Sequence, residues 1–370
     1  MSDASPSLYA LLLAGGAGTR FWPASRAARP KQLLSLVGDE ALLRATARRV
    51  LPLCDPAEGQ PAWDRVLVAT GSHLLEATQA LLPEIPPENF LVEPVPRNTA
   101  PCIGWAAARV AREDPDAVVA VLPSDHHVAD VPGFREILRA AVDSAARGTI
   151  TTVGIRPTHP ETGFGYIETG AEIGGGALGA LRFVEKPDRE RAAAFVSSGR
   201  YLWNAGMFFF RARDMLAAIR SHLPALAEGL EELDDAAARG AEVEALAHVF
   251  PGLPPVSIDH GVMEHLAELA VVPGDFGWSD VGSWRSAWEL APRDEDGNSA
   301  PQGTVLIDAQ SNLVVDLRRQ GGKRVIALVG VEDLVVVETD DALLVVPRER
   351  AQDVKHVVDA LKGRGEGGLV

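Results

Sequence analysis

The stretch that decides the fold, residues 8–31, reads LYALLLAGGAGTRFWPASRAARPK. It joins an apolar run to a glycine-rich loop that carries Arg20 and Lys31, and residues 4–37 contain no Asp or Glu. The whole protein, in contrast, has a net charge of -16. Glycines expose backbone N–H groups while Arg and Lys supply positive charge, a combination that binds phosphates. The stretch therefore predicts a phosphate-binding loop at the end of a buried strand.

The loop matches neither of two common phosphate-binding signatures. A P-loop requires Lys followed by Ser or Thr after its last glycine, whereas Gly18 is followed by Thr19 and Arg20. A dinucleotide-binding fingerprint requires a third glycine, and Phe21 occupies that position. Both classes are therefore excluded for this loop.

The longer segment GGAGTRFWPASRAARPKQLL, residues 15–34, resembles the signature of the sugar-1-phosphate nucleotidylyltransferases, and most closely their branch that transfers GMP to mannose 1-phosphate. The resemblance is strong over about residues 8–290 and weak beyond them. The roles that follow for Arg20 and Lys31 are to bind the triphosphate and to neutralise charge on the reacting phosphorus. Arg26 and Arg29 are interpreted as solvated surface residues.

Composition narrows the class of protein. The 370 residues are 46% hydrophobic and 23% charged, which is ordinary for a globular protein, and the sequence pI is about 5.0. This acidity argues against binding to nucleic acid or to anionic membranes. The apolar runs are too short to span a bilayer, the N-terminus lacks a signal peptide, and two cysteines build no disulfide framework. We therefore expect a cytoplasmic protein.

The first half of the chain alternates apolar strand-like runs with helical segments. Strands are expected at residues 8–13, 65–70, 89–92, 117–122 and 149–154, and helices at 40–53, 73–82, 100–112 and 134–147. Such alternation is typical of a mostly parallel sheet covered by helices on both faces, with ligands at the carboxyl ends of the strands. We expect a Rossmann-like α/β fold with a mixed, mostly parallel sheet over residues 1–291.

A polar, turn-rich segment, PRDEDGNSAPQG at residues 292–303, is the predicted linker. Short β-like runs and one final helix follow it, so residues 304–370 are expected to form a small C-terminal β domain. The spacing of these runs fits either a small sandwich or a β-helix. The family resemblance favours a short left-handed β-helix. Some relatives carry a further cupin-type isomerase domain, and we expect no isomerase activity here.

Two aspartates are the candidate metal ligands. Asp125 follows a buried strand in VVAVLPSDHHV, and Asp280 lies in the glycine-rich loop GDFGWSDVGSW. Each also fits an ordinary capping or turn residue. The resemblance assigns both to Mg²⁺, which two carboxylates, phosphates and water would hold. His126 and His127 lack further zinc ligands at a suitable spacing, and we interpret them as structural.

Sugar recognition is predicted for three segments, GFGYIE, FVEKP and WNAGMF. They occur in the order found in the resembling family. Their candidate residues are Gly165, Glu168, Glu185, Lys186 and Asn204. Carboxylate and amide groups can bind vicinal hydroxyls, and Lys186 can hold the sugar phosphate. Taken singly, Glu185-Lys186-Pro187 also fits a charged turn. A further acidic stretch, residues 259–265 (DHGVMEH), matches neither zinc motif and is interpreted as helical surface.

The nucleotide site is expected to include the loop residues Gly15, Gly16, Gly18 and Thr19. In the resembling guanylyl enzymes, segments similar to EPVPRNTAP at residues 93–101 also line this site. Asn98 and Thr99 are therefore candidate contacts, although a helix-capping role fits them nearly as well.

The resemblance implies that GTP and mannose 1-phosphate react to give GDP-mannose and pyrophosphate, with Mg²⁺ as cofactor. Two alternatives stay open: a nucleotidylyltransferase that uses another nucleotide or hexose phosphate, and a catalytically silent sensor of a nucleotide sugar. The oligomeric state is also open, with a homodimer as the candidate.

Overall fold

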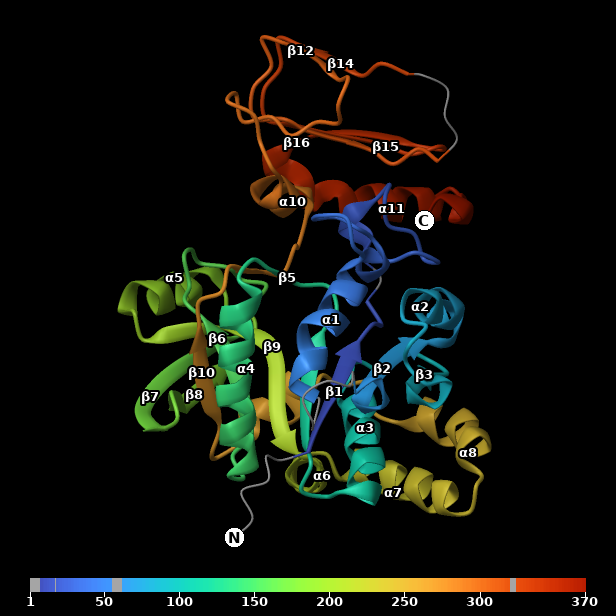
Figure 1. Ribbon diagram of the computed structural model, residues 1–370, viewed down its shortest axis with the longest axis vertical. Helices are drawn as coiled ribbons and strands as arrows, with labels where there is room; N and C mark the ends of the chain where they lie inside the picture. The colour runs from blue at the N-terminus through green and yellow to red at the C-terminus, as the bar shows by residue number, and fades with distance from the viewer. Residues whose placement is uncertain (1–6, 17, 55–61, 320–323) are drawn as a thin grey trace. The chain divides into compact units, whose positions relative to one another are not determined.

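A computed structural model describes residues 7–16, 18–54, 62–319 and 324–370 (Figure 1). By packing of the Cα trace, the chain divides into two compact units. The first unit contains the chain up to Gly15, Thr46–Ser124 and Val128–Trp278. The second unit contains Gly16–Ala45, Asp125–His127 and Ser279–Val370. The second unit thus combines the predicted phosphate-binding loop and both predicted metal ligands with the predicted linker and C-terminal domain.

The first unit is built on a nine-stranded mixed sheet in the order β3-β2-β1-β4-β9-β6-β10-β8-β7. Its strands are β1 (Leu8–Leu13), β2 (Val66–Gly71), β3 (Phe90–Glu93), β4 (Val118–Pro123), β6 (Thr151–Ile155), β7 (Tyr166–Gly174), β8 (Ala177–Val184), β9 (Tyr201–Arg211) and β10 (Ala270–Gly274). The strands β3, β2, β1 and β4 are mutually parallel, whereas β9 runs antiparallel to β4 and β6. The expected mixed α/β sheet and its first five strands are confirmed, to within two residues at each end.

Helices cover both faces of this sheet. The helices between residues 42 and 261 are α1 (Leu42–Cys54), α2 (Leu75–Leu81), α3 (Thr99–Glu113), α4 (Val131–Ala146), α5 (Arg189–Ser198), α6 (Ala212–His222), α7 (Pro224–Ala238), α8 (Glu242–Val249) and α9 (Ile258–Gly261). One apolar core joins α3, α6 and α7 to alternate side chains of the central strands, among them Leu11, Val121 and Phe210. Helix α4 packs across β4, β6, β9 and β10 and lies in front of the sheet in Figure 1. Burial on both faces explains why the strands are continuously apolar.

The second unit contains α10 (Trp284–Leu290), α11 (Val354–Gly363) and the strands β12 (Val305–Ile307), β13 (Leu313–Asp316), β14 (Ala327–Val329), β15 (Leu334–Glu338) and β16 (Leu343–Pro347). Val305 pairs with Ala327, Gln310 with Glu332, and Leu313 with Val335, all in parallel. A constant offset of 22 residues between these pairs is the signature of stacked coils. Among the two folds expected for this domain, the pairing therefore favours a β-helix over a sandwich.

A buried asparagine connects successive coils. Asn312, which is 0% exposed, donates from Nδ2 to Oδ1 of Asn298 at 3.0 Å and to the carbonyl oxygen of Val331 at 3.2 Å. Its own Oδ1 accepts from the backbone N–H of Leu334 at 2.9 Å. Because the side chains of Asn298 and Asn312 are buried, leaving one of their polar groups unpaired would cost about 1–3 kcal/mol. The asparagine contacts therefore fix the register of the coils.

Helix length also bears on membrane insertion. Across the described ranges, no helix is both long and apolar enough to span a bilayer.

Candidate active site

Hydrogen bonds within the second unit hold the predicted phosphate-binding loop in shape. Gly18 adopts a left-handed conformation with φ of 57°, which starts a short 3-10 turn at Thr19–Phe21. The Ser25 hydroxyl donates to the carbonyl oxygen of Gly18 at 2.7 Å, and Nε2 of Gln32 donates to that of Gly16 at 3.2 Å. The Arg20 side chain is exposed. These carbonyl oxygens are already hydrogen-bonded, and the cation is exposed. This is the arrangement expected of a loop that binds anions.

Lys31 is buried, with only 6% of its surface exposed, and it joins three distant segments of the second unit. Its Nζ donates to Oδ2 of Asp125 at 2.9 Å and to the main-chain oxygen of Asp280. Desolvation raises the pKa of Asp125, but the nearby charges of Lys31 and His126 outweigh it and hold that pKa below its ordinary value. Asp125 therefore stays ionised. The sequence predicted that Lys31 would face the triphosphate; the structure adds its role in organising both aspartates.

The loop around Asp280 has an unusual backbone. Val281, directly after Asp280, has a positive φ of 46°, which a β-branched residue rarely adopts. Gly282 allows space for the carboxylate, because a Cβ at that position would lie 2.8 Å from Oδ2 of Asp280. Strained backbone of this kind is retained where the surrounding contacts hold it in place, and it is frequent at functional sites.

The donor set of Asp125 and Asp280 suits Mg²⁺ better than a transition metal. In the parts of the chain that the structure describes, no group of three or more His, Cys, Asp or Glu could hold a metal ion. Mg²⁺ is commonly held by one or two carboxylates together with substrate phosphates and water. An ionised Asp125 meets that requirement, whereas a structural zinc site would need four protein ligands.

In the first unit, a buried carboxyl group lies beside the end of β1. Glu93 is the last residue of β3, and a Cβ on Gly15 would lie 3.7 Å from its Oε2. Its Oε1 is buried and has no hydrogen-bond partner among the described residues. Burial raises the pKa of this carboxyl to about 7. The sequence analysis did not identify Glu93 as a candidate site residue. An acidic residue at the end of an apolar strand was the signal that could have identified it.

Asn98 and Thr99 begin helix α3. Asn98 Oδ1 accepts from the backbone N–H of Thr99 at 2.9 Å, so the capping role left open by the sequence is present. Asn98 also has a positive φ of 65°. Oγ1 of Thr99 accepts from the backbone N–H of Ile258 at 2.9 Å, which fixes helix α9 beside the start of α3.

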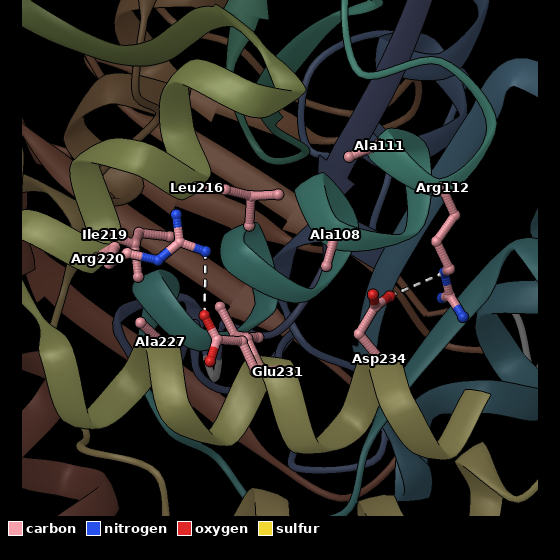
Figure 2. A pocket seen from close by; sticks show the side chains of 10 residues that line it. Ala108, Ala111, Arg112, Leu216, Ile219, Arg220, Ala227, Glu231 and Asp234 are labelled. Atoms are coloured by element: carbon pink, nitrogen blue, oxygen red, sulfur yellow. Dashed lines mark hydrogen bonds and ion pairs between the residues drawn. The ribbon is translucent and has the colours of Figure 1, made fainter. Parts of the chain in front are cut away.

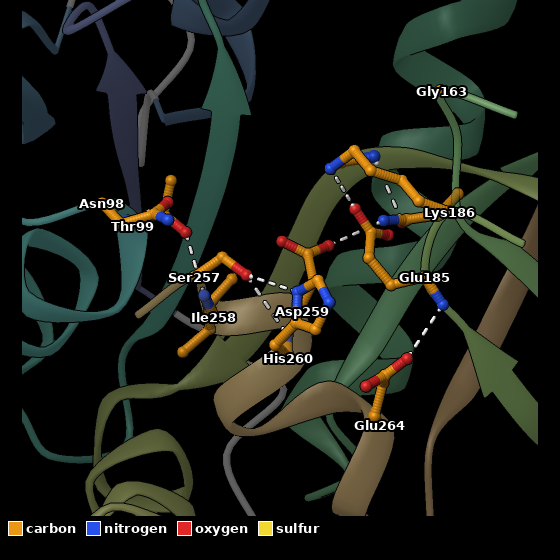
Figure 3. Close-up of polar contacts among 12 residues, drawn as sticks. Asn98, Thr99, Gly163, Glu185, Lys186, Ser257, Ile258, Asp259, His260 and Glu264 are labelled. Atoms are coloured by element: carbon orange, nitrogen blue, oxygen red, sulfur yellow. Dashed lines mark hydrogen bonds and ion pairs between the residues drawn. The ribbon is translucent and has the colours of Figure 1, made fainter. Parts of the chain in front are cut away.

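Four of the five predicted sugar residues, Gly165, Glu185, Lys186 and Asn204, gather in one cluster, in which Figure 3 labels Glu185 and Lys186. A Cβ on Gly165 would lie 2.6 Å from Oε2 of Glu185 and 3.3 Å from Cβ of Asn204, so only glycine fits there without displacing Glu185. Lys186 Nζ donates to Oε1 of Glu185 at 2.6 Å. Lys186 also has a positive φ of 47°. This cluster combines hydroxyl acceptors with a cation.

Glu168 lies in a different set of contacts. Its Oε2 accepts from the Tyr201 hydroxyl at 2.9 Å and from Arg182 at 3.2 Å, while Oε1 pairs with Arg200 at 3.3 Å. Its side chain is only 12% exposed. These partners occupy both carboxylate oxygens, so Glu168 connects β7, β8 and β9.

The stretch at residues 259–265 is helical as expected, but the surface interpretation is wrong. Val262 and Met263 are buried, and both acidic residues make polar contacts within the unit. Asp259 is half-buried and accepts from Nδ2 of Asn204 at 2.9 Å. Glu264 accepts from the backbone N–H of Glu185 at 2.9 Å (Figure 3). The sequence could not reveal these contacts, because they join positions 55 and 79 residues apart.

A separate pocket of about 220 Å³ lies among α3, α6 and α7 (Figure 2). Its apolar floor includes Ala108, Leu216 and Leu230, and ion pairs of Arg112 with Asp234 and Arg220 with Glu231 border it. Ala108 lies about 14 Å along α3 from Thr99 at 1.5 Å per residue. None of the predicted site residues lines this pocket.

Comparison with known proteins defines the class. Residues 9–297 match the nucleotidyl transferase family, and residues 303–361 match the family described as "MannoseP isomerase/GMP-like beta-helix domain". The fold and the candidate site thus define a nucleotidyltransferase. The chain belongs to the nucleotidyl transferase family and carries the C-terminal β domain of its ManC-type members. The two matches leave residues 298–302 between them.

Several relatives extend over nearly the whole chain. The xanthan biosynthesis protein XanB of Xanthomonas campestris pv. campestris is 41% identical over 367 residues, which is 99% of this chain and 74% of that protein. The mannose-1-phosphate guanylyltransferase of Klebsiella pneumoniae is 39% identical over 361 residues, covering 96% and 74%. A solved structure described as "mannose-1-phosphate geranyltransferase" from Thermus thermophilus has a TM-score of 0.83 at 36% identity, covering 96% of this chain and 99% of that one.

Gly18→Ala is expected to inactivate the enzyme by displacing Lys31. The added Cβ would lie 2.6 Å from Cβ of Lys31 and 2.7 Å from its backbone nitrogen, and the left-handed φ adds strain. We expect kcat to fall roughly 100-fold, as for other small displacements of catalytic groups, with about 1–2 kcal/mol of lost stability. Gly363→Ala in α11, where no atom lies within 4 Å, is the control. Equal kcat for both variants would contradict this account.

Glu93→Gln is expected to stabilise the protein at alkaline pH. Burial raises the pKa of Glu93 from 4.5 to about 7, so its neutral form is favoured and stability is lost as pH rises through that interval. Glutamine stays neutral, so the variant should gain up to about 3 kcal/mol over the wild type between pH 4.5 and pH 8. Urea denaturation at both pH values measures the difference. The exposed Glu88→Gln is the control, and a pH-independent difference for Glu93→Gln would refute the prediction.

Proposed function

We propose that the protein transfers GMP from GTP to mannose 1-phosphate, giving GDP-mannose and pyrophosphate. The observation that supports this most is the contact of Lys31 with both Asp125 and the main chain of Asp280, which organises two carboxylates next to a cationic loop. The Klebsiella pneumoniae relative is named mannose-1-phosphate guanylyltransferase, which supports the choice of guanine nucleotide and mannose 1-phosphate.

The proposed reaction is an in-line displacement on phosphorus. A phosphate oxygen of mannose 1-phosphate attacks the α-phosphorus of GTP, and the bond to pyrophosphate breaks. No strong general base is required, since a phosphate monoester with a second pKa of about 6 is already mostly dianionic at neutral pH. Catalysis then rests on positioning and charge neutralisation by Arg20 and the glycine-rich loop. Asp125 and Asp280 would hold Mg²⁺, which supplies Lewis-acid stabilisation of the phosphates when bound.

Glu93 is the proposed reader of the guanine base. In its ionised form, which pairing with two donors would favour, the Glu93 carboxylate only accepts hydrogen bonds, and guanine presents two adjacent donors, N1–H and the N2 amino group. Adenine and cytosine each place an acceptor nitrogen beside a single amino group, and uracil flanks its N3–H with two carbonyl oxygens. A buried carboxylate facing those acceptors would be left partly unpaired, which costs about 1–3 kcal/mol or more. The unpartnered Oε1 of Glu93 beside Gly15 supports this role.

Three finer features complete the proposal. The C-terminal coils are proposed to wind as a short left-handed β-helix, on the basis of the family resemblance. The location is proposed to be the cytoplasm, where the nucleotide substrates are made. A homodimer is the proposed assembly state.

A substrate panel tests the proposal directly. The wild-type protein is assayed with GTP, ATP, CTP, UTP or dTTP, each combined with mannose 1-phosphate or glucose 1-phosphate, and pyrophosphate release is measured. We expect the highest kcat/KM with GTP and mannose 1-phosphate. Efficient turnover only with another nucleotide or sugar would replace this function by another nucleotidylyltransferase, and no turnover with any pair would favour a silent sensor. In Glu93→Gln, kcat/KM for GTP should fall roughly 10- to 100-fold.

Asp280→Asn is expected to weaken Mg²⁺ binding and leave folding intact. The change removes one negative charge at the proposed Mg²⁺ site and preserves the shape of the side chain. The Mg²⁺ concentration for half-maximal activity should rise roughly 10-fold or more, by analogy with the loss of groups that support metal ligands. A Mg²⁺ titration of steady-state activity measures it, with the exposed Asp359→Asn as control. An unchanged titration would remove Asp280 from the metal site.

A further inference from the structure

A carboxylate that the sequence placed on a helical surface lies inside the sugar cluster. Asp259 is in the first turn of α9, after the cap residue Ser257, whose hydroxyl accepts from the backbone N–H of His260 at 3.3 Å. The same short helix is fixed to the start of α3 through Thr99 and Ile258. Asp259 is thus held by backbone contacts on both sides, as a binding residue requires.

The orientation of Asn204 makes Asp259 an acceptor. Asn204 Oδ1 receives a hydrogen bond from the backbone N–H of Gly206 at 3.2 Å. It also lies 3.0 Å from the Thr152 hydroxyl, which contacts the main-chain oxygen of Met207 at 2.9 Å. The amide nitrogen of Asn204 must therefore face the other way, where it donates to Oδ1 of Asp259 at 2.9 Å. Since a carboxylate can accept about four hydrogen bonds, the amide of Asn204 and the backbone N–H of Asp259 itself leave this carboxylate with unused capacity.

A second carboxylate, Glu185, is close enough to act on Asp259. Burial, and then the charge of Glu185, raise the pKa of Asp259 to about 6, while Lys186 and Asn204 lower it. The cluster therefore presents two acceptors and the ammonium of Lys186, which pairs with Glu185 (Figure 3). Two close carboxylates are unfavourable by themselves, and hydroxyl donors from a ligand would relieve this cost.

We propose that Asp259 is a specificity-determining residue of the sugar site, which accepts a hydrogen bond from a ring hydroxyl of the hexose phosphate, with Asn204 positioning it. This inference rests on the proposed function and deepens it. Glu185 and Asp259 together bind hydroxyls, and Lys186 binds the phosphate of the same molecule. Asn204 then acts through Asp259 as a positioning residue.

The test combines substrate analogues with two variants. KM and kcat are measured for wild type, Asp259→Asn and Asp259→Ala, with mannose 1-phosphate and each of its monodeoxy analogues. Loss of a hydrogen bond to a charged group predicts a KM for mannose 1-phosphate that is roughly 10- to 100-fold higher in both variants. The KM for GTP should change less than twofold. One deoxy analogue should bind the wild type weakly, yet match mannose 1-phosphate in the variants, because the interaction is then already absent.

One control variant and the activity of the wild type distinguish the possible outcomes. Asp235→Asn, an exposed change on α7 in the same unit, should behave as the wild type. The assignment would be overturned if the variants raised the KM for GTP as much as that for mannose 1-phosphate. It would also be overturned if the effect of every deoxy analogue added fully to the effect of the variant. Either result would indicate a structural role only. If the wild type does not turn over GTP with mannose 1-phosphate at all, the proposed function fails and this inference fails with it. Wild-type turnover with unchanged variants would overturn this inference alone.

Discussion

The ion pair between Lys31 and Asp125 is the interaction on which the candidate active site of the second unit depends. It is 2.9 Å long, it involves a lysine with 6% exposure, and the same ammonium also holds the main chain of Asp280. Removing one partner from a fully buried pair commonly costs about 3–5 kcal/mol. Because the Asp125 side chain is 38% exposed, the cost here is smaller. One buried cation thus contacts Asp125, two residues after β4, and the main chain of Asp280.

The two compact units contain different kinds of chemistry. The second unit holds the cation-bearing loop with Asp125 and Asp280, which suit phosphates and a divalent cation. The first unit holds Glu93, Glu185 and Asp259, which suit donors on a base and a sugar. Both units place a non-glycine residue with positive φ beside these groups, Val281 in one and Lys186 in the other. Such strain fits a site whose geometry is imposed by its surroundings.

Local patterns in the sequence were sufficient for the sheet and for the loop. Apolar runs marked β1 to within its observed bounds, and the absence of acids marked the loop, because both features are continuous in the chain. Long-range contacts were not accessible in this way. Asp259 accepts a hydrogen bond from Asn204, and Glu168 pairs with Arg182 and Arg200 from neighbouring segments. A single sequence contains no signal for such contacts, so the surroundings of these carboxylates could not be predicted from it.

Two carboxyl groups of the first unit, Glu93 and Asp259, are energetically unfavourable in the free protein, and ligand binding would explain why the chain retains them. Glu93 and Asp259 have pKa values raised to about 7 and about 6, so each destabilises the folded protein when it ionises at neutral pH. Better-packed neutral residues would remove that cost, which makes a purely structural role a poor explanation. A ligand with hydrogen-bond donors pairs these groups only in the folded state, and binding then stabilises that state in proportion to its affinity. The unpaired carboxylates that destabilise the free protein therefore increase its selectivity for a ligand with hydrogen-bond donors at both Glu93 and Asp259.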